Sequence, residues 1–188
     1  VRSALMKNCH DSASIKEGLF TLTAPTGSGK TLAMLLFALK HAKDNGFRRI
    51  VVVLPYLSII EQTASVYRKI FEPFFGKHYV LEHHSLADIG FEQSVSDSDG
   101  KTGEIEAVER QRRLLSENWD APIIITTSVQ MLESLFSNRP AACRKLHRLR
   151  DAVIMFDEVQ TLPVNLVLPT LAVLSHLSHN FHSTVVFA

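Results

Sequence analysis

The chain has 188 residues, of which 46% are hydrophobic and 21% charged, so it is long and apolar enough for one folded domain with a sizeable core. This composition excludes a disordered or collagen-like chain. Lys and Arg total 20 against 19 for Asp and Glu, and the formal net charge of +1 gives no overall basic excess that would indicate binding to nucleic acid or membranes.

The cysteine count and the apolar runs predict the cellular compartment of the protein. Two cysteines are too few for a disulfide framework, and no apolar run approaches the ~18 residues that a membrane span needs. We therefore expect a soluble protein of the cytoplasm with no membrane partner. The first residue is Val and there is no signal peptide, so we also expect a piece of a longer protein.

Short β-branched runs alternate with helical segments along the chain. The runs predict strands, of the kind that is buried on both faces, at residues 19–24, 50–54, 123–126, 153–156 and 184–188. Helices are predicted at residues 30–44, 57–71, 104–117, 129–137 and 164–179. A weaker strand is predicted at residues 78–82 and a mobile surface loop at residues 92–103. The alternation predicts an α/β fold, a three-layer sandwich with a mainly parallel central sheet, as a single domain over residues 1–188.

A glycine-rich segment joins the first predicted strand to the first predicted helix. After Ala24 it continues with Pro25, Thr26, Gly27, Ser28, Gly29, Lys30 and Thr31. This matches the P-loop of nucleotide hydrolases except that Ala replaces the first Gly. The glycines let backbone N–H groups turn toward phosphate oxygens, and the helix that follows adds the positive end of its dipole. We expect the segment to bind ATP, with Lys30 at the β- and γ-phosphates and the Thr31 hydroxyl on Mg²⁺.

An acidic pair follows the apolar run at residues 153–156. The run delivers Asp157 and Glu158 to the carboxyl end of a predicted strand, where ligands bind in open α/β sheets. Asp157 is expected to hold Mg²⁺ through its coordinated waters, and Glu158 to orient or deprotonate the water that attacks the γ-phosphate. The pair predicts hydrolysis of ATP rather than binding alone.

Together these segments resemble the superfamily 2 helicases. Asp157-Glu158-Val159-Gln160 is similar to their DExx box, here in a DExQ form, and this adds Gln160 to the expected nucleotide-binding residues. More narrowly, APTGSGKT, LPYLSIIEQT, LEHHSLAD and FDEVQTLP resemble the CRISPR-associated helicase–nuclease of type I interference systems. The resemblance implies a RecA-like P-loop ATPase lobe, the first of the two lobes that such enzymes pair.

The resemblance also implies a nucleic-acid surface. Pro55, Tyr56 and Gln62 correspond to a segment that contacts a nucleic-acid backbone, and Thr127 and Ser128 correspond to the next such motif. Translocating motors grip the sugar-phosphate backbone largely through hydroxyls and amides, which agrees with a net charge near zero. Serine and threonine at strand ends are also common helix caps, and Ser128 is a candidate cap for the helix at residues 129–137.

The family's activity implies four partners: single-stranded DNA, a second RecA-like lobe, a metal-dependent nuclease domain and a guide-RNA surveillance complex. The second lobe donates arginines to the ATP site, and without them turnover can fall by ~10³–10⁵. We expect this chain alone to bind Mg·ATP weakly, to hydrolyse it very slowly and to unwind nothing. Two alternatives stay open: a motor lobe of another superfamily 2 translocase, and a nucleotide-sensing module without translocation.

Several histidines could suggest metal binding. His10 and Asp11 resemble nuclease ligands but stand alone, so no nuclease is expected in this chain. A second group recurs every third residue near the end of the last predicted helix and is interpreted as a set of surface residues: His176, His179 and His182.

Three further features have plain structural interpretations or stay open. The cations between residues 139 and 150 are interpreted as a solvated helix face. Trp119 is expected to pack just before the strand at residues 123–126. His83 and His84 are equally consistent with a loop near nucleic acid and with a structural role.

Overall fold

The computed structural model describes residues 2–25, 27–84 and 114–188. The predicted mobile loop at residues 92–103 and most of the predicted helix at residues 104–117 lie outside the described residues. Residues 114–118, which overlap the end of that predicted helix, are helical.

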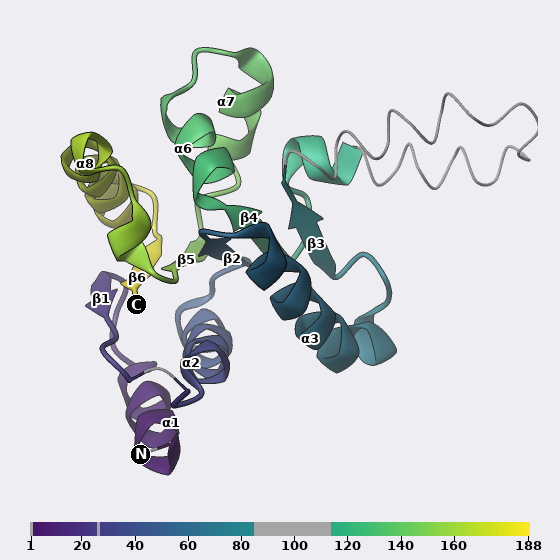
Figure 1. Cartoon of the computed structure of the whole chain (residues 1–188), viewed down its shortest axis with the longest axis vertical. Helices are drawn as coiled ribbons and strands as arrows, with labels where there is room; N and C mark the ends of the chain where they lie inside the picture. The colour runs from purple at the N-terminus through teal and green to yellow at the C-terminus, as the bar shows by residue number, and fades with distance from the viewer. Residues whose placement is uncertain (1, 26, 85–113) are drawn as a thin grey trace, which may run out of the picture.

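The core of the fold is one sheet of six strands in the order β1-β6-β5-β2-β4-β3, and every neighbouring pair is parallel. The strands are β1 (Leu19–Thr21), β2 (Arg49–Leu54), β3 (Val80–His83), β4 (Ile123–Thr127), β5 (Ala152–Phe156) and β6 (Thr184–Phe187). β2 lies between β4 and β5, and Val52 pairs with Ile125 on one side and Met155 on the other. All strands therefore end at the same edge of the sheet. Figure 1 shows them in this order, from β1 on the left to β3 on the right.

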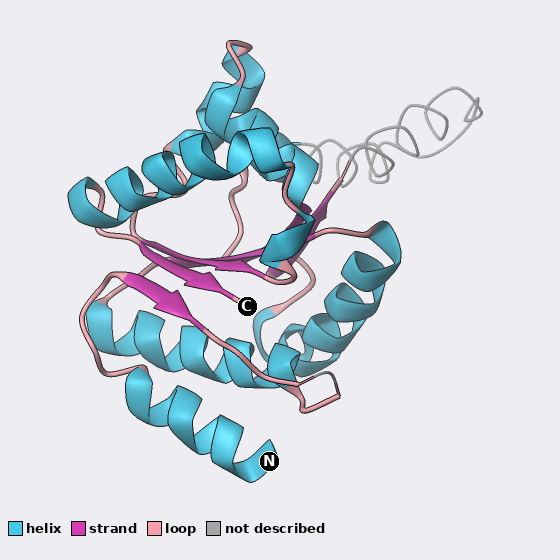
Figure 2. Ribbon diagram, turned by 60° about the vertical axis from the view of Figure 1, so that its left-hand side comes forward, coloured by secondary structure: helices cyan, strands magenta, loops and turns pink. Residues whose placement is uncertain are grey.

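Helices cover both faces of this sheet, which gives the three layers seen in Figure 2. One layer holds α2 (Lys30–Asn45) and α3 (Leu57–Phe75), and the other holds α6 (Ser128–Phe136), α7 (Pro140–Leu146) and α8 (Val164–Asn180). α1 (Arg2–Ser12) packs against α2 on the side away from the sheet. A single 3-10 turn, η1 (Val159–Thr161), precedes α8. The predicted three-layer α/β sandwich with a parallel sheet is confirmed.

The two faces of the sheet form two separate apolar cores, because successive side chains of a strand point to opposite faces. On β2, Val52 and Leu54 pack with α2 and α3, whereas Val51 and Val53 pack with α6 and α8. β4 and β5 are buried along their whole length and β2 is buried from Ile50 to Leu54, as their continuous apolar runs predict.

Local structure differs from the prediction in three places. β1 is an edge strand with one neighbour, so Leu19 is exposed rather than buried on both faces. The weak strand is present as β3, which begins two residues and ends one residue later than predicted. α1 was not predicted, because it has little amphipathic periodicity. The helix expected between residues 139 and 150 is present but short, as the seven residues of α7.

Candidate active site

The predicted site residues gather at the carboxyl edge of the sheet. The glycine-rich loop follows β1, Asp157 and Glu158 follow β5, Pro55 and Tyr56 follow β2, and Ser128 follows β4. In the strand order, the ATP-binding candidates lie at β1 and β5, and the nucleic-acid candidates lie at the adjacent β2 and β4. The edge is thus divided into two neighbouring regions.

The glycine-rich loop has the backbone that a phosphate loop needs. Gly27 and Gly29 both have positive φ, 74° and 86°, which a residue with a Cβ adopts only at a cost. The Ser28 N–H donates to the Pro25 carbonyl at 3.2 Å and closes the turn. Gly29 is then the N-cap of α2, and its carbonyl accepts the first hydrogen bond of that helix, from Ala33. Thr26 lies outside the described residues.

Lys30 joins this loop to the acidic pair. Its Nζ lies 2.7 Å from Asp157 Oδ1 and 3.3 Å from Glu158 Oε1. Burial lowers the pKa of the Lys30 ammonium, but its hydrogen bonds and ion pairs with Asp157 and Glu158 outweigh that effect and raise the pKa overall. Lys30 is therefore charged at neutral pH, and its charge is compensated by two carboxylates.

The backbone after β5 orients the side chains of Asp157 and Glu158. The Asp157 N–H donates to the Val53 carbonyl at 3.0 Å, which holds it against β2. Glu158 has a left-handed φ of 58°, a conformation that costs free energy for a residue with a Cβ. Its side chain accepts a hydrogen bond from Gln160 Nε2 at Oε2, while Oε1 faces Lys30. Gln160 therefore contacts the general-base candidate directly.

The residues present fit a nucleotide and a divalent cation. Ser28 is buried, with 7% of its surface exposed, and its hydroxyl oxygen has no hydrogen-bond partner among the described residues, so it is available for a ligand. Thr31 and Asp157 offer the hydroxyl and carboxylate oxygens that Mg²⁺ prefers. Thr31 follows Lys30 in the sequence, and the Asp157 carboxylate lies 2.7 Å from Lys30 Nζ.

The nucleic-acid candidates divide into exposed and buried groups. Tyr56 is 58% exposed and Gln62 is exposed on α3. Thr127 is buried, and its Oγ1 accepts a hydrogen bond from the Gln130 N–H at 3.0 Å, so Thr127 and not Ser128 is the cap of α6. Ser128 is half-buried and is the first residue of α6.

A buried polar cluster behind β4 was not predicted. His83 is 2% exposed, and its Nε2 lies 3.0 Å from Lys145 Nζ on α7. Lys145 also lies over the ring of Trp119, 5.6 Å from its centroid. Burial lowers the pKa of His83 to about 3, helped by the charge of Lys145. Lys145 is thus not part of a solvated helix face, because α7 turns it toward the sheet, whereas the expected packing of Trp119 is confirmed.

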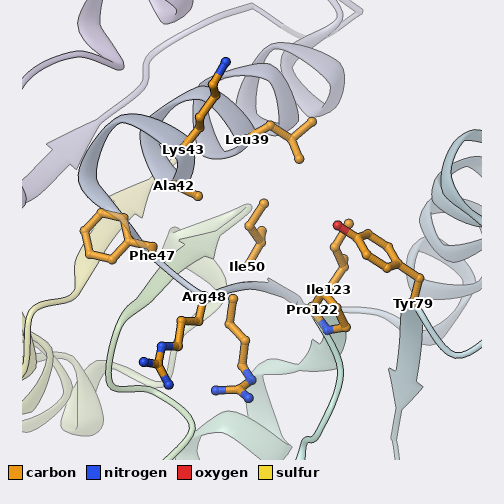
Figure 3. A pocket seen from close by; sticks show the side chains of 10 residues that line it. Leu39, Ala42, Lys43, Phe47, Arg48, Ile50, Tyr79, Pro122 and Ile123 are labelled. Atoms are coloured by element: carbon orange, nitrogen blue, oxygen red, sulfur yellow. The ribbon is translucent and has the colours of Figure 1, made fainter. Parts of the chain in front are cut away.

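A small pocket lies at the opposite edge of the sheet, where β2 and β4 begin. Its volume is about 190 Å³, and Leu39, Ile50, Tyr79 and Ile123 form its apolar wall beside Arg48 (Figure 3). It is separated from the glycine-rich loop by the length of α2, so it is not the nucleotide site.

The described part of the chain has neither a metal-binding cluster nor a membrane-spanning helix. No group of three or more His, Cys, Asp or Glu residues gathers there in a way that could hold a metal ion. No helix in the same residues is long and apolar enough to cross a membrane.

Comparison with known proteins decides the family. Residues 7–187 match the sequence profile of the DEAD/DEAH box helicases. The chain belongs to this family. The CRISPR-associated nuclease/helicase Cas3 of Haloferax volcanii is 34% identical over 152 residues, which are 76% of this chain and 16% of that protein.

Solved structures confirm the fold of this DEAD/DEAH box helicase lobe. The crystal structure of T. fusca Cas3-ATP has a TM-score of 0.72 at 21% identity and is matched over 99% of this chain and 20% of its own. The Pyrococcus furiosus Hef helicase domain has a TM-score of 0.53 at 17% identity, over 97% of this chain and 32% of its own. The chain therefore spans about a sixth to a third of the length of these relatives.

Proposed function

We propose that this chain is the ATP-binding first RecA-like lobe of a DNA helicase similar to Cas3. The observation that carries the proposal is the contact of Lys30 with both Asp157 and Glu158, since it assembles the two halves of a P-loop ATPase site. A structural ion pair would not need the two left-handed glycines or an unpartnered buried hydroxyl beside it. Those features support a phosphate ligand.

Each residue has a separate task in this proposal. Lys30 leaves the carboxylates and binds the β- and γ-phosphates, while the N–H groups from Gly27 to Thr31 hold the same phosphates. Asp157 and Thr31 are the residues that would hold Mg²⁺. Glu158 orients and deprotonates the attacking water, and Gln160 keeps its carboxylate in place. Bound Mg·ATP supplies the phosphoanhydride whose hydrolysis drives movement.

The parent protein's partners belong to the same proposal. They are single-stranded DNA, held near Pro55, Tyr56, Gln62, Thr127 and Ser128, a second RecA-like lobe, a nuclease domain and a guide-RNA surveillance complex in the cytoplasm. The Thr127 hydroxyl oxygen accepts the Gln130 N–H and caps α6, and its own O–H can still donate to a phosphate oxygen. The lobe alone hydrolyses ATP very slowly, because arginines from the second lobe complete the site.

Nucleotide binding by the purified chain tests the site. Mg·ATP is titrated against the parent chain and against Lys30→Ala, with Lys7→Ala as an exposed lysine control. We expect binding to the parent and to Lys7→Ala, and none to Lys30→Ala at the same concentrations. Equal binding by Lys30→Ala would refute the assignment of the phosphate loop.

The motor assignment needs a second measurement. We expect the isolated chain to show no DNA-stimulated ATP turnover and no strand separation. Once a second RecA-like lobe is supplied, single-stranded DNA should change the affinity for ATP. Sustained DNA-stimulated turnover by the chain alone would contradict the single-lobe proposal, and an ATP affinity that ignores DNA in the two-lobe protein would favour a nucleotide sensor.

A further inference from the structure

A cationic side chain outside the motifs lies against the phosphate loop. If Gly29 carried a Cβ, that atom would lie 3.1 Å from Arg2 Nε and 3.6 Å from Arg2 Cδ and Cγ. The Arg2 side chain therefore occupies the space that the missing side chain of Gly29 leaves. Gly29 directly precedes Lys30, so the guanidinium group is close to the expected phosphate-binding atoms.

α1 is held in a position that keeps Arg2 there. The helix packs against α2, as Figures 1 and 2 show. Cys9 is 5% exposed and Ala13, just beyond the helix, is fully buried. The carbonyl of Ala13 lies 2.8 Å from His41 Nδ1 on α2, which ties the end of α1 to that helix. Arg2 thus reaches the loop from the first turn of a helix that packs against α2.

The Arg2 guanidinium group is exposed to solvent and is available to an anion. Lys30 is neutralised by Asp157 and Glu158, whereas no carboxylate in the described part of the chain forms an ion pair with Arg2. The positive end of the α2 dipole lies at the same place, and a cation there is unfavourable unless an anion joins it. Ser28, buried and without a hydrogen-bond partner among these residues, adds an unused donor at the same loop.

We propose that Arg2 is a phosphate-binding residue of the nucleotide site. The inference rests on the proposed function, because it needs a nucleotide at the glycine-rich loop. A guanidinium group presents several donors in a plane and suits phosphate oxygens, and its long stem can turn the few ångströms from Gly29 toward them. Arg2 binds the phosphates and not the base, so its effect grows with the number of phosphates.

Nucleotide titrations of Arg2 variants of the full 188-residue chain test this. Kd is measured for Mg·ATP, Mg·ADP and AMP with the parent, Arg2→Ala, Arg2→Lys and Lys7→Ala. Lys7 is exposed on the same helix, so Lys7→Ala is the control for the change in net charge. We expect Arg2→Ala to weaken Mg·ATP binding about tenfold and Mg·ADP binding less. AMP binding and the Lys7→Ala chain should stay within about twofold of the parent values, and Arg2→Lys should keep part of the affinity.

The possible failures are distinguishable. If the parent binds Mg·ATP, Lys30→Ala does not, and Arg2→Ala binds like the parent, the role of Arg2 is refuted and the proposed function stands. An equal loss for all three nucleotides, or the same loss in Lys7→Ala, also overturns the phosphate assignment. If the parent binds no nucleotide, both proposals fall. Thermal melting of each variant shows that an observed loss does not come from unfolding.

Discussion

Lys30 Nζ lies 2.7 Å from Asp157 Oδ1, although their strands, β1 and β5, are separated by β6 in the sheet. The contact crosses one strand because the loop after β1 and the turn after β5 both extend beyond the same edge. It places the lysine of the phosphate loop on the acid that is expected to hold Mg²⁺. Without a nucleotide, the two groups neutralise each other, and a ligand must separate them.

Asp157→Asn should therefore change the Mg²⁺ dependence of ATP binding. In the parent, we expect Mg²⁺ to tighten ATP binding, because Asp157 holds the ion through its coordinated waters. In Asp157→Asn the effect of Mg²⁺ should fall by about tenfold, while ATP binding in EDTA is unchanged or tighter because Lys30 is freed. Titrations with Mg²⁺ and with EDTA measure both values. Asp11→Asn, an exposed carboxylate on α1, should behave like the parent; parent-like Mg²⁺ dependence in Asp157→Asn would contradict the metal role.

The stability of the chain should fall as the pH drops below about 6.5, in part because of His41. Burial lowers the pKa of His41, whose ring lies 2.8 Å from both Ala13 O and Thr184 Oγ1. The unfolded chain, with an ordinary histidine pKa of about 6.5, then binds the proton first. The contribution of His41 is complete above that pH and is lost below it, by at most about 1.4 kcal/mol per pH unit.

Urea unfolding at pH 7.5, 6.5 and 5.5 measures this slope. His41→Phe should be less stable at every pH, because it loses two hydrogen bonds, but its stability should depend less on pH. The pKa of His83 is also lowered, to about 3, so His83 too makes stability fall with pH. Some pH dependence of stability therefore remains in His41→Phe. His10→Gln, at an exposed site, should keep the parent's slope. An unchanged slope in His41→Phe would show that His41 is not the responsible group.

Gly29→Ala should reveal the contact with Arg2 through a double-mutant cycle. Positive φ alone should cost about 1–2 kcal/mol of unfolding free energy at either Gly27 or Gly29. At Gly29 the new Cβ would also displace Arg2, whereas at Gly27 it would meet no atom within 4 Å. Combining each change with Arg2→Ala should give additive costs for Gly27→Ala and a coupling of at least about 0.5 kcal/mol for Gly29→Ala. Additivity in both pairs would argue against the contact.

Thr127→Ala should destabilise the fold more than Ser128→Ala does. The Thr127 hydroxyl caps α6, and loss of such a cap costs about 1 kcal/mol. Ser128 is half-buried inside the first turn, so its loss should change stability by no more than about 0.5 kcal/mol. Thermal or urea unfolding compares the two variants. A larger loss of stability in Ser128→Ala would show that Ser128, and not Thr127, caps α6.

Local sequence was enough to identify the candidate ATP site. A phosphate loop is built from consecutive residues, so Gly27, Gly29 and Lys30 are visible as a pattern before any fold is known. The acidic pair is visible for the same reason, since a buried strand delivers it to the edge of the sheet. The parallel sheet itself follows from alternating apolar runs and helices.

Other features depended on which segments meet in space. The order of strands made β1 an exposed edge, and the same packing buried Lys145 and His83 together although both are polar. The position of Arg2 beside Gly29 comes from α1, a helix with little periodicity of its own. The spacing of residues along the sequence determines the short-range geometry of a motif. Burial and charge balance depend on neighbours that are distant along the chain, so only the tertiary structure decided them.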